Sequence, residues 1–172
     1  MWTSAACDAG EAFLSLVRTI SAGVLVYRRR GEDLEFLLVH PGGPYWRNRE
    51  EAAWSLPKGL AEEGEDLASA AAREFEEELG QPIIGDLEPL TPCRQPGGKV
   101  VYAWMAEADL DLNQVRSNLF EMEWPRGSGR LRQFPEVDRA AYFPALRAME
   151  KAHRGLRPIL AEAMVKLGVS AP

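Results

Sequence analysis

The segment from Asp66 to Gly80 constrains the fold more than any other part of this sequence of 172 residues. Its apolar residues recur at intervals of three and four, which is typical of a helix with one buried face. They are Leu67, Ala70, Ala71, Phe75 and Leu79. Gly80 favours the end of a helix, and Pro82 prevents the helix from resuming. The pattern therefore predicts a helix over 66–79 that packs its apolar side against other elements.

Runs rich in β-forming residues lie on both sides of this helix. Ser21–Tyr27 and Leu34–His40 are separated by a polar stretch that contains Gly31, a pattern that predicts a hairpin. Val100–Ala106 predicts another strand, and Tyr142–Phe143 predicts a last short one. Strands near the centre of a chain, with helices before and after them, indicate a layered α/β domain.

The rest of the chain is less regular. Residues 109–135 show no sustained pattern, so we expect a long irregular excursion there. Ala145–Ala152 and Pro158–Leu167 are amphipathic and predict two helices near the end of the sequence. The length fits one domain, which we place at 21–172 after an N-terminal extension over 1–20.

The net charge of the chain is −6, and it is concentrated in one segment. Eight acidic and two basic residues lie between Lys58 and Gly80, so acids and bases balance in the rest of the sequence. This distribution argues against an extended surface for a nucleic-acid polymer, which requires positive charge. No apolar run approaches the roughly 20 residues that cross a bilayer, so we expect no membrane partner. Two cysteines and no secretion signal favour a cytoplasmic location.

Glu74, Glu77 and Glu78 stand at positions i, i+3 and i+4, so a helix presents all three carboxylates on one face. One interpretation is a solvated acidic face, which is the common role of such runs. The alternative is a site for Mg²⁺ or Mn²⁺, because three hard oxygen ligands would lie beside the backbone carbonyls of a glycine-containing loop. The apolar side of the helix packs inward and leaves the carboxylates next to that loop, SLPKGLAEEGE, which favours the metal site.

The spacing around these carboxylates resembles the Nudix box of the Nudix hydrolase family. The family pattern is a glycine, five residues, a glutamate, seven residues, and then R-E-U-x-E-E-x-G-U, in which U is apolar. Gly59 and Glu65 stand at the first two positions here, and REFEEELG occupies 73–80. The last apolar position is Gln81, a departure that concerns packing at the helix exit rather than the chemistry. The resemblance implies an α/β/α sandwich with a central mixed sheet over 21–168.

The resemblance also implies a role for each residue of the box. Glu74, Glu77 and Glu78 resemble the carboxylates that bind the metal, and the backbone near Gly59 resembles a carbonyl ligand. Glu74 is also a candidate to orient or deprotonate the attacking water, and Glu77 is counted with it among the catalytic residues.

Three further residues resemble positions of the family. Glu65 and Arg73 resemble the pair that ties the loop to the helix, with Arg73 neutralising part of the carboxylate repulsion. Family members often use an additional glutamate shortly before an aromatic strand, and Glu136 stands six residues before Tyr142. Glu136 is therefore a further catalytic candidate, and a plain surface glutamate is the alternative.

Five residues are candidates for contact with the substrate. Lys58 in LPKG, and Lys99 and Tyr102 in KVVYAW, resemble positions of family members that cleave dinucleoside polyphosphates. The alternatives are a solvated loop lysine, an ordinary strand end and a core aromatic residue. Arg130 and Arg132 lie in a loop with Gly and Ser, where they could close over a polyphosphate, and a solvated loop is the alternative.

The resemblance implies a Mg²⁺- or Mn²⁺-dependent pyrophosphohydrolase that cleaves a nucleoside diphosphate linkage by attack of water on phosphorus. Its expected partner is a nucleoside polyphosphate, preferably a dinucleoside polyphosphate, and the oligomeric state stays open. Two alternatives remain: a house-cleaning pyrophosphatase for damaged nucleoside triphosphates, and a non-catalytic Nudix-fold regulator that binds nucleotides. The intact carboxylates argue against the regulator, because a protein that only binds has no need of repelling charges on one helix.

Overall fold

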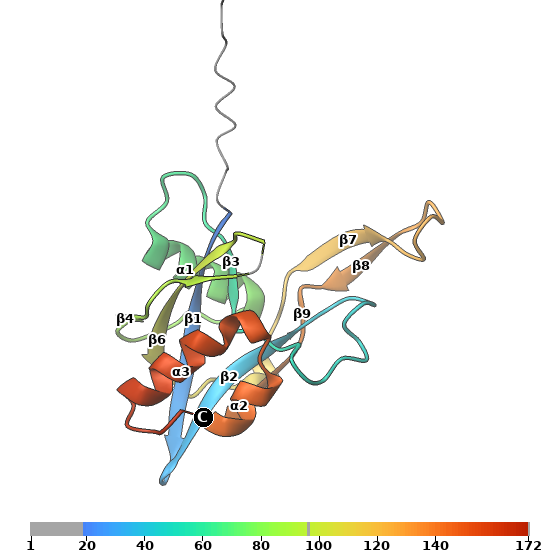
Figure 1. The fold of residues 1–172 in the computed structure, drawn as a ribbon. Coiled ribbons are helices and arrows are strands. Elements are labelled where there is room, and N and C mark those ends of the chain that lie inside the picture. Colours follow the sequence, from blue (N-terminus) through green and yellow to red (C-terminus); the bar gives the residue numbers. More distant parts are fainter. Residues whose placement is uncertain (1–18, 96, 172) are drawn as a thin grey trace, which may run out of the picture.

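The computed structural model describes residues 19–95 and 97–171 (Figure 1). The predicted N-terminal extension lies outside these residues, except for Thr19 and Ile20. In the described ranges, no helix is both long enough and apolar enough to cross a membrane.

The described part of the chain contains three α-helices, two single-turn 3₁₀ helices and nine strands. The helices are α1 (Leu67–Leu79), α2 (Ala145–Lys151) and α3 (Arg157–Lys166), and the 3₁₀ helices are Leu112–Gln114 and Arg154–Leu156. The strands of the main sheet are β1 (Ile20–Arg30), β2 (Asp33–Pro41), β3 (Lys58–Leu60), β4 (Glu88–Pro89), β5 (Cys93–Arg94), β6 (Val100–Glu107) and β9 (Val137–Pro144). The remaining two strands are β7 (Leu119–Glu123) and β8 (Leu131–Pro135), which form a sheet of their own. The predicted helices and the predicted hairpin are confirmed, with boundaries that differ by a few residues.

The central strand of the main sheet is β1, and the strand order is β4-β6-β1-β2-β9. β6 runs parallel to β1, whereas β2 and β3 run antiparallel to it. β3 pairs with the first residues of β1, and β2 pairs with the last ones, so both strands share one edge of β1. Ser55 forms a bridge to Val39 on β2, and the Pro57 carbonyl then accepts from the Val24 N–H on β1 at 3.0 Å. The chain that enters the predicted site is thus held between β2 and β1.

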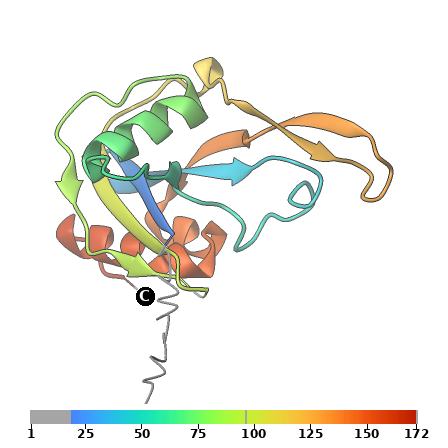
Figure 2. The same cartoon turned by 90° about the horizontal axis from the view of Figure 1, so that it is seen from above.

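Alternate residues of β1 face opposite sides of the sheet and build two cores. Val24 and Val26 pack toward α1 together with the fully buried Phe75. Leu25 packs toward α2 and α3 together with Ile159. Figure 2 shows α1 on one side of the sheet and α2 and α3 on the other. The predicted α/β/α sandwich with a mixed central sheet is therefore confirmed.

Both ends of α1 are fixed by local interactions. Asp66 caps the helix, since its side chain accepts from the Ser69 N–H at 2.9 Å, and α1 therefore begins at the following residue. Gly80 adopts a left-handed conformation with φ 70°, and its N–H donates to the Glu76 carbonyl at 2.7 Å. These caps hold the rotation and length of the helix, and so the direction of its carboxylate face.

Two parts of the chain are more regular than the sequence predicts. Residues 109–135 include the β7–β8 hairpin, which extends away from the main body (Figure 2), so the prediction of an irregular excursion is wrong. Each of these strands is short, and a long turn separates them, so the sequence carries too little alternation to mark them. The last strand, β9, runs over Val137–Pro144 rather than Tyr142–Phe143. Its first residues, VDRAA, have little preference for strands, and pairing with the buried β2 supplies the missing stabilisation.

Candidate functional site

β3 and α1 bring the loop glycine against the carboxylate face of the helix. Gly59 lies opposite Ala22 of β1, in the region of the sheet that α1 covers. A Cβ atom on Gly59 would lie 1.8 Å from Oε2 of Glu74. Glycine is therefore required at this position, because it lets the carboxylate rest directly against the loop backbone.

Arg73 connects the same loop to the helix. Its Nε and Nη2 donate to the two carboxylate oxygens of Glu65, each at 2.9 Å, and Nη2 also donates to the Leu60 carbonyl at 3.1 Å. Its Nη1 donates to Glu74 at 2.9 Å and to Glu77 at 3.2 Å. The fork of charge-assisted bonds from Arg73, followed by the Glu62 N–H, lowers the pKa of Glu65 to about 2. Arg73 thus orders the loop and compensates two of the three carboxylates in part.

Glu78 is the least compensated carboxylate of the site. Its Oε2 is buried and has no hydrogen-bond partner among the described residues. Burial raises the pKa of Glu78 to about 8, because the charged form loses its hydration, and the charge of Lys58 offsets only part of this effect. Burial also raises the pKa of Glu74, in spite of its bond to Arg73. Two carboxylates partly shielded from water, with one buried oxygen left unpartnered, form an oxygen-rich position suited to a cation.

The predicted lysines lie near each other beside this position. Burial lowers the pKa of Lys58, the charge of Lys99 lowers it further, and the carboxylates of α1 oppose this shift. The alternation of β6 places Tyr102 on the α1 face of the sheet, the face on which Trp104 packs. The structure therefore places Lys58 near the carboxylates and Lys99 near Lys58, with Tyr102 on the face of the sheet that α1 covers.

Glu136 lies close to the same carboxylates although it is distant in sequence. After burial, its charge is one of the causes that raise the pKa of Glu74 and of Glu78. Its own backbone is fixed on both sides: its N–H donates to the Asn118 carbonyl at 2.9 Å, and its carbonyl accepts from the Gly42 N–H at 2.8 Å. The side chain of Glu136 is exposed, so it projects toward solvent at the rim of the carboxylate site.

Asn118 and Gly42 are residues of the site that the sequence analysis missed. The Asn118 N–H donates to the Glu77 carbonyl at 3.3 Å, which connects the base of the β7–β8 hairpin to α1. A Cβ atom on Gly42 would lie 1.8 Å from the Pro135 carbonyl oxygen, so this close approach requires glycine. The glycine pair in HPGGP is the available signal for that approach, whereas nothing in the sequence marks Asn118.

Arg130 and Arg132 are not brought to the carboxylates. Both are exposed on the β7–β8 hairpin, which leads away from the main body (Figure 2). Among the described residues, the ion-pair partner of Glu74 and Glu77 is Arg73. The part of the hairpin that borders the site is its base, beside Glu136.

The chemistry of the donors suits a hard divalent ion. Glu74, Glu77, Glu78 and the backbone carbonyl of Gly59 supply oxygen atoms, which Mg²⁺ and Mn²⁺ prefer. Oε2 of Glu78 accepts no hydrogen bond from the described residues, so this oxygen is available as a metal ligand. Within the described part of the chain, no three acidic, histidine or cysteine side chains converge as a finished metal site. Binding of an ion would therefore require the carboxylates to move closer together; Arg73 holds one oxygen, Oε1, of Glu74 and of Glu77.

Comparison with known proteins gives one family. The family model of the NUDIX domain matches residues 17–163 of this chain. Nudix hydrolase 7 of Arabidopsis thaliana is 28% identical over 131 residues, a match that covers 72% of this chain and 44% of that protein. This chain therefore spans less than half the length of that relative.

Solved structures share the fold. An Ap4A hydrolase of C. elegans in a binary complex has a TM-score of 0.58 at 23% identity, over 87% of this chain and 98% of that one. The NUDIX domain of NrtR from Shewanella oneidensis, complexed with ADP ribose, has a TM-score of 0.61 at 16% identity, over 87% of this chain and 88% of that one. At these identities the likeness concerns the fold alone. The match of the NUDIX domain model over most of the sequence confirms the resemblance seen in the residues, and the chain belongs to the Nudix family.

Proposed function

We propose that this chain is a divalent-metal-dependent pyrophosphohydrolase that cleaves a nucleoside diphosphate linkage by attack of water on phosphorus. The observation that carries the proposal is the buried, unpartnered Oε2 of Glu78, on the same helix face as the partly buried carboxylate of Glu74. An uncompensated carboxylate below the surface costs stability, so a binding role gives a physical reason for its presence.

Glu74, Glu77, Glu78 and the Gly59 carbonyl would hold the ion. When bound, the ion neutralises phosphate oxygens and stabilises the charge that develops on the leaving phosphate. Arg73 keeps its two bonds to Glu65 whether or not the carboxylates turn toward an ion. The loop that carries the carbonyl ligand is thus held independently of the ligands on the helix.

Glu136 is the candidate that orients and deprotonates the attacking water. Its side chain is exposed, and among the described residues it forms no ion pair, so both carboxylate oxygens can accept a proton or a hydrogen bond. It also lies near Glu74 and Glu78, where the water would approach the bound phosphate. Glu74 is the alternative base, but its bond to Arg73 occupies one of its oxygens.

The substrate class we favour is a dinucleoside polyphosphate. A long phosphate chain extends beyond the metal site and needs positive charge farther along, which Lys58 and Lys99 supply together. Tyr102 on the same face of the sheet adds an aromatic ring to that surface. The C. elegans relative in fold is an Ap4A hydrolase, which agrees with this choice without deciding it. Such a substrate fits the cytoplasmic location that the sequence predicts.

The test is a comparison of substrates under excess Mg²⁺. We expect the kcat/KM of diadenosine tetraphosphate to exceed that of oxidised dGTP, and Lys99→Ala to lower it about tenfold, the effect of one charge-assisted contact. The matched control is Lys166→Ala. Lys166 lies on α3, away from the carboxylates, and pairs with Glu88 of β4.

Each contrary outcome has a distinct meaning. A tenfold preference for oxidised dGTP would make the chain a house-cleaning pyrophosphatase and leave the metal chemistry intact. Tight binding of nucleotides without any product would favour the non-catalytic regulator. Equal loss in Lys99→Ala and Lys166→Ala would remove Lys99 from the substrate surface.

A further inference from the structure

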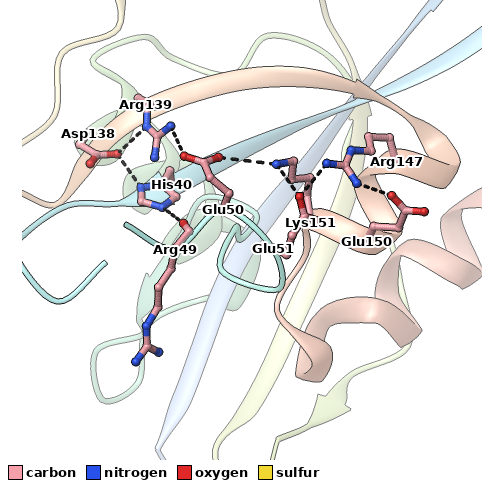
Figure 3. A network of polar contacts seen from close by, with 9 residues as sticks. All are labelled: His40, Arg49, Glu50, Glu51, Asp138, Arg139, Arg147, Glu150 and Lys151. Atoms are coloured by element: carbon pink, nitrogen blue, oxygen red, sulfur yellow. Dashed lines mark hydrogen bonds and ion pairs between the residues drawn. The ribbon is translucent and has the colours of Figure 1, made fainter. Parts of the chain in front are cut away.

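A second group of charged residues connects β2, β9, α2 and the loop after β2 (Figure 3). Its members are His40, Arg49, Glu50, Glu51, Asp138, Arg139, Arg147, Glu150 and Lys151. This network lies outside the carboxylate site. One end of it, however, borders Glu136, which stands two residues before Asp138.

His40 is the buried end of this network. The side chain has no exposed surface, and its ring packs against Trp54 with the centroids 5.1 Å apart. Nε2 lies 2.7 Å from the carbonyl oxygen of Arg49, and Nδ1 lies 2.7 Å from Oδ1 of Asp138. A carbonyl and a carboxylate both accept hydrogen bonds, so both contacts are satisfied by a ring that carries a hydrogen on each nitrogen. The ring thus ties the loop after β2 to the beginning of β9.

Asp138 reaches His40 because β9 is irregular at this point. His40 pairs with Arg139, whereas the next residue, Pro41, pairs with Val137. Asp138 is therefore the extra residue of a β-bulge and has no partner on β2. A bulge turns a side chain from the face that regular alternation would give it, and here it aims Asp138 at the ring.

The same bulge sets the direction in which the chain leaves Glu136. The Gly42 N–H, two residues after His40, donates to the Glu136 carbonyl at 2.8 Å. A Cβ atom at Gly42 would overlap the Pro135 carbonyl, so the two backbones are in contact there. Between this contact and the His40–Asp138 pair, the chain has only Val137, which is itself buried. Glu136 is thereby held between two fixed points.

We propose that His40 and Asp138 are positioning residues, which lock the bulge at the start of β9 and so hold the Glu136 side chain toward Glu74 and Glu78. They do not touch the substrate and act through Glu136 alone. This inference rests on the proposed function, in which Glu136 orients the attacking water.

The rest of the network provides a matched control. Arg139 pairs with Glu50 at 2.6 Å, and Lys151 pairs with Glu50 at 3.6 Å, so Glu50 joins the loop after β2 to β9 and α2 without contact to His40. Glu50→Gln removes a carboxylate of the same network and leaves the His40–Asp138 contact in place. The effect of Glu50→Gln on amide exchange shows how much of any change comes from the loss of a charge elsewhere in the network.

The first measurement is amide hydrogen exchange, which needs no activity. In Asp138→Ala we expect exchange at Gly42 and Glu136 to accelerate at least tenfold, since these two N–H groups hold the segment, while Glu50→Gln leaves both rates within twofold. Asp138 is partly exposed, with 28% of its side-chain surface accessible, so the variant is expected to fold. Asp138→Asn keeps an oxygen that accepts from Nδ1 and should accelerate exchange less than Asp138→Ala does. Unchanged exchange in Asp138→Ala, or the same acceleration in Glu50→Gln, overturns the inference.

The second measurement is turnover of a nucleoside polyphosphate with Mg²⁺. Asp138→Ala should lower kcat about tenfold with KM within twofold, because a displaced base affects the chemical step rather than substrate binding. In a Glu136→Gln background, adding Asp138→Ala should change kcat less than twofold, because the residue it positions is already disabled. A further tenfold loss in that background overturns the inference.

The two proposals can fail separately. A wild-type protein that turns over no phosphoric anhydride, or full activity in Glu136→Gln, contradicts the proposed function or the role of Glu136 in it. The exchange rates at Gly42 and Glu136 then still decide whether His40 and Asp138 hold the segment.

Discussion

Two regions of this molecule concentrate charge, and they differ in how each charge is compensated. On α1, two of the three carboxylates, Glu74 and Glu77, share a single arginine, and that arginine is also bound to Glu65. In the network of Figure 3, acids and bases alternate, so each carboxylate has a cation within ion-pair distance. Glu136 links the two regions, because its charge acts on Glu74 and Glu78 and it stands two residues before Asp138 of the network.

This difference distinguishes charges that stabilise the fold from charges that are available to bind a ligand. Paired charges fix one segment against another and leave little affinity for an added ion. Glu74 and Glu77 of α1 share one such partner, Arg73, and Glu78 keeps a buried oxygen with none among the described residues. Compensation, rather than the number of charges, therefore distinguishes a candidate site from a structural network.

The largest expected effect comes from removing one carboxylate of the uncompensated region. Glu77→Gln keeps the size and helical preference of the side chain and removes one ligand charge. Turnover should fall by about 10³-fold, because the metal loses a charged ligand. Unfolding in urea should show equal or slightly greater stability, because repulsion on the helix face decreases. Glu51→Gln, in the compensated network, is the control and should keep full turnover; full activity in Glu77→Gln, or activity in excess chelator, would contradict the metal site.

A smaller loss is expected when a carboxylate is displaced rather than removed. In Gly59→Ala the new Cβ atom would lie 1.8 Å from Oε2 of Glu74, so the carboxylate must move. We expect turnover to fall about 100-fold, the order of effect that a misplacement near 1 Å produces. Gly155→Ala is the matched control, because its Cβ atom would meet only side-chain atoms, Cγ of Gln95 at 3.2 Å and Nδ1 of His153 at 3.3 Å, away from the carboxylates. Equal activity of the two variants would show that Glu74 does not need its present position.

The part of the compensated network away from His40 and Asp138 should respond in stability and not in activity. Lys151 is nearly buried and pairs with Glu51 at 2.9 Å and Glu50 at 3.6 Å. Lys151→Met keeps the packing of the stem and removes the charge, so we expect a loss of about 1 kcal/mol in the free energy of unfolding in urea. Turnover with saturating Mg²⁺ should stay within twofold of the wild type. A loss of turnover above tenfold in a folded Lys151→Met variant would mean that Lys151 and its ion pairs also contribute to catalysis.

The smallest effect is expected at Glu65, and it depends on pH. The bonds from Arg73 hold the pKa of Glu65 at about 2 in the folded protein, below its usual value of 4.5. A carboxyl with a depressed pKa contributes stability that is present above the unfolded value and is lost as pH falls through the folded one. The stability difference between the wild type and Glu65→Gln should therefore be full at pH 6 and decrease as pH falls from 4.5 toward 2. Urea unfolding at pH 6, 4.5 and 3 checks this; a difference that does not change with pH would contradict the ion pair.

Local sequence patterns are sufficient for the elements with many apolar residues. The apolar spacing of α1 and the runs of β-forming residues in β1, β2 and β6 are local properties, and the structure confirms these elements. The β7–β8 hairpin and the first half of β9 have no such signal, because β7 forms by pairing with β8 and β9 forms by pairing with β2. These strands depend on their pairing partners rather than on the preferences of their own residues.

The candidate site likewise has a part that the sequence predicts and a part that only the fold reveals. The carboxylates of α1 and Gly59 follow from spacing within one motif, and the structure places them together. Glu136 is near them, but only the fold shows that Asn118 and Gly42 hold it there. Arg130 and Arg132 carry suitable charge for a polyphosphate, yet the hairpin directs them away from the main body. The sequence shows which residues are charged, whereas the direction in which their side chains lie depends on how the strands pair and pack.

The central position of β1 has a consequence for the order of folding. β1 and β2 are joined by a short turn, whereas β1 and β6 pair Ile20 with Val100 across most of the first half of the domain. Closing a long loop costs entropy before its contacts form, so local pairs form more readily than distant ones. We therefore expect the β1–β2 hairpin to form early and the parallel pair to form late. The apolar side of α1 packs on β1 and β6 together. The carboxylate face of the helix therefore acquires its final position only when that late step is complete.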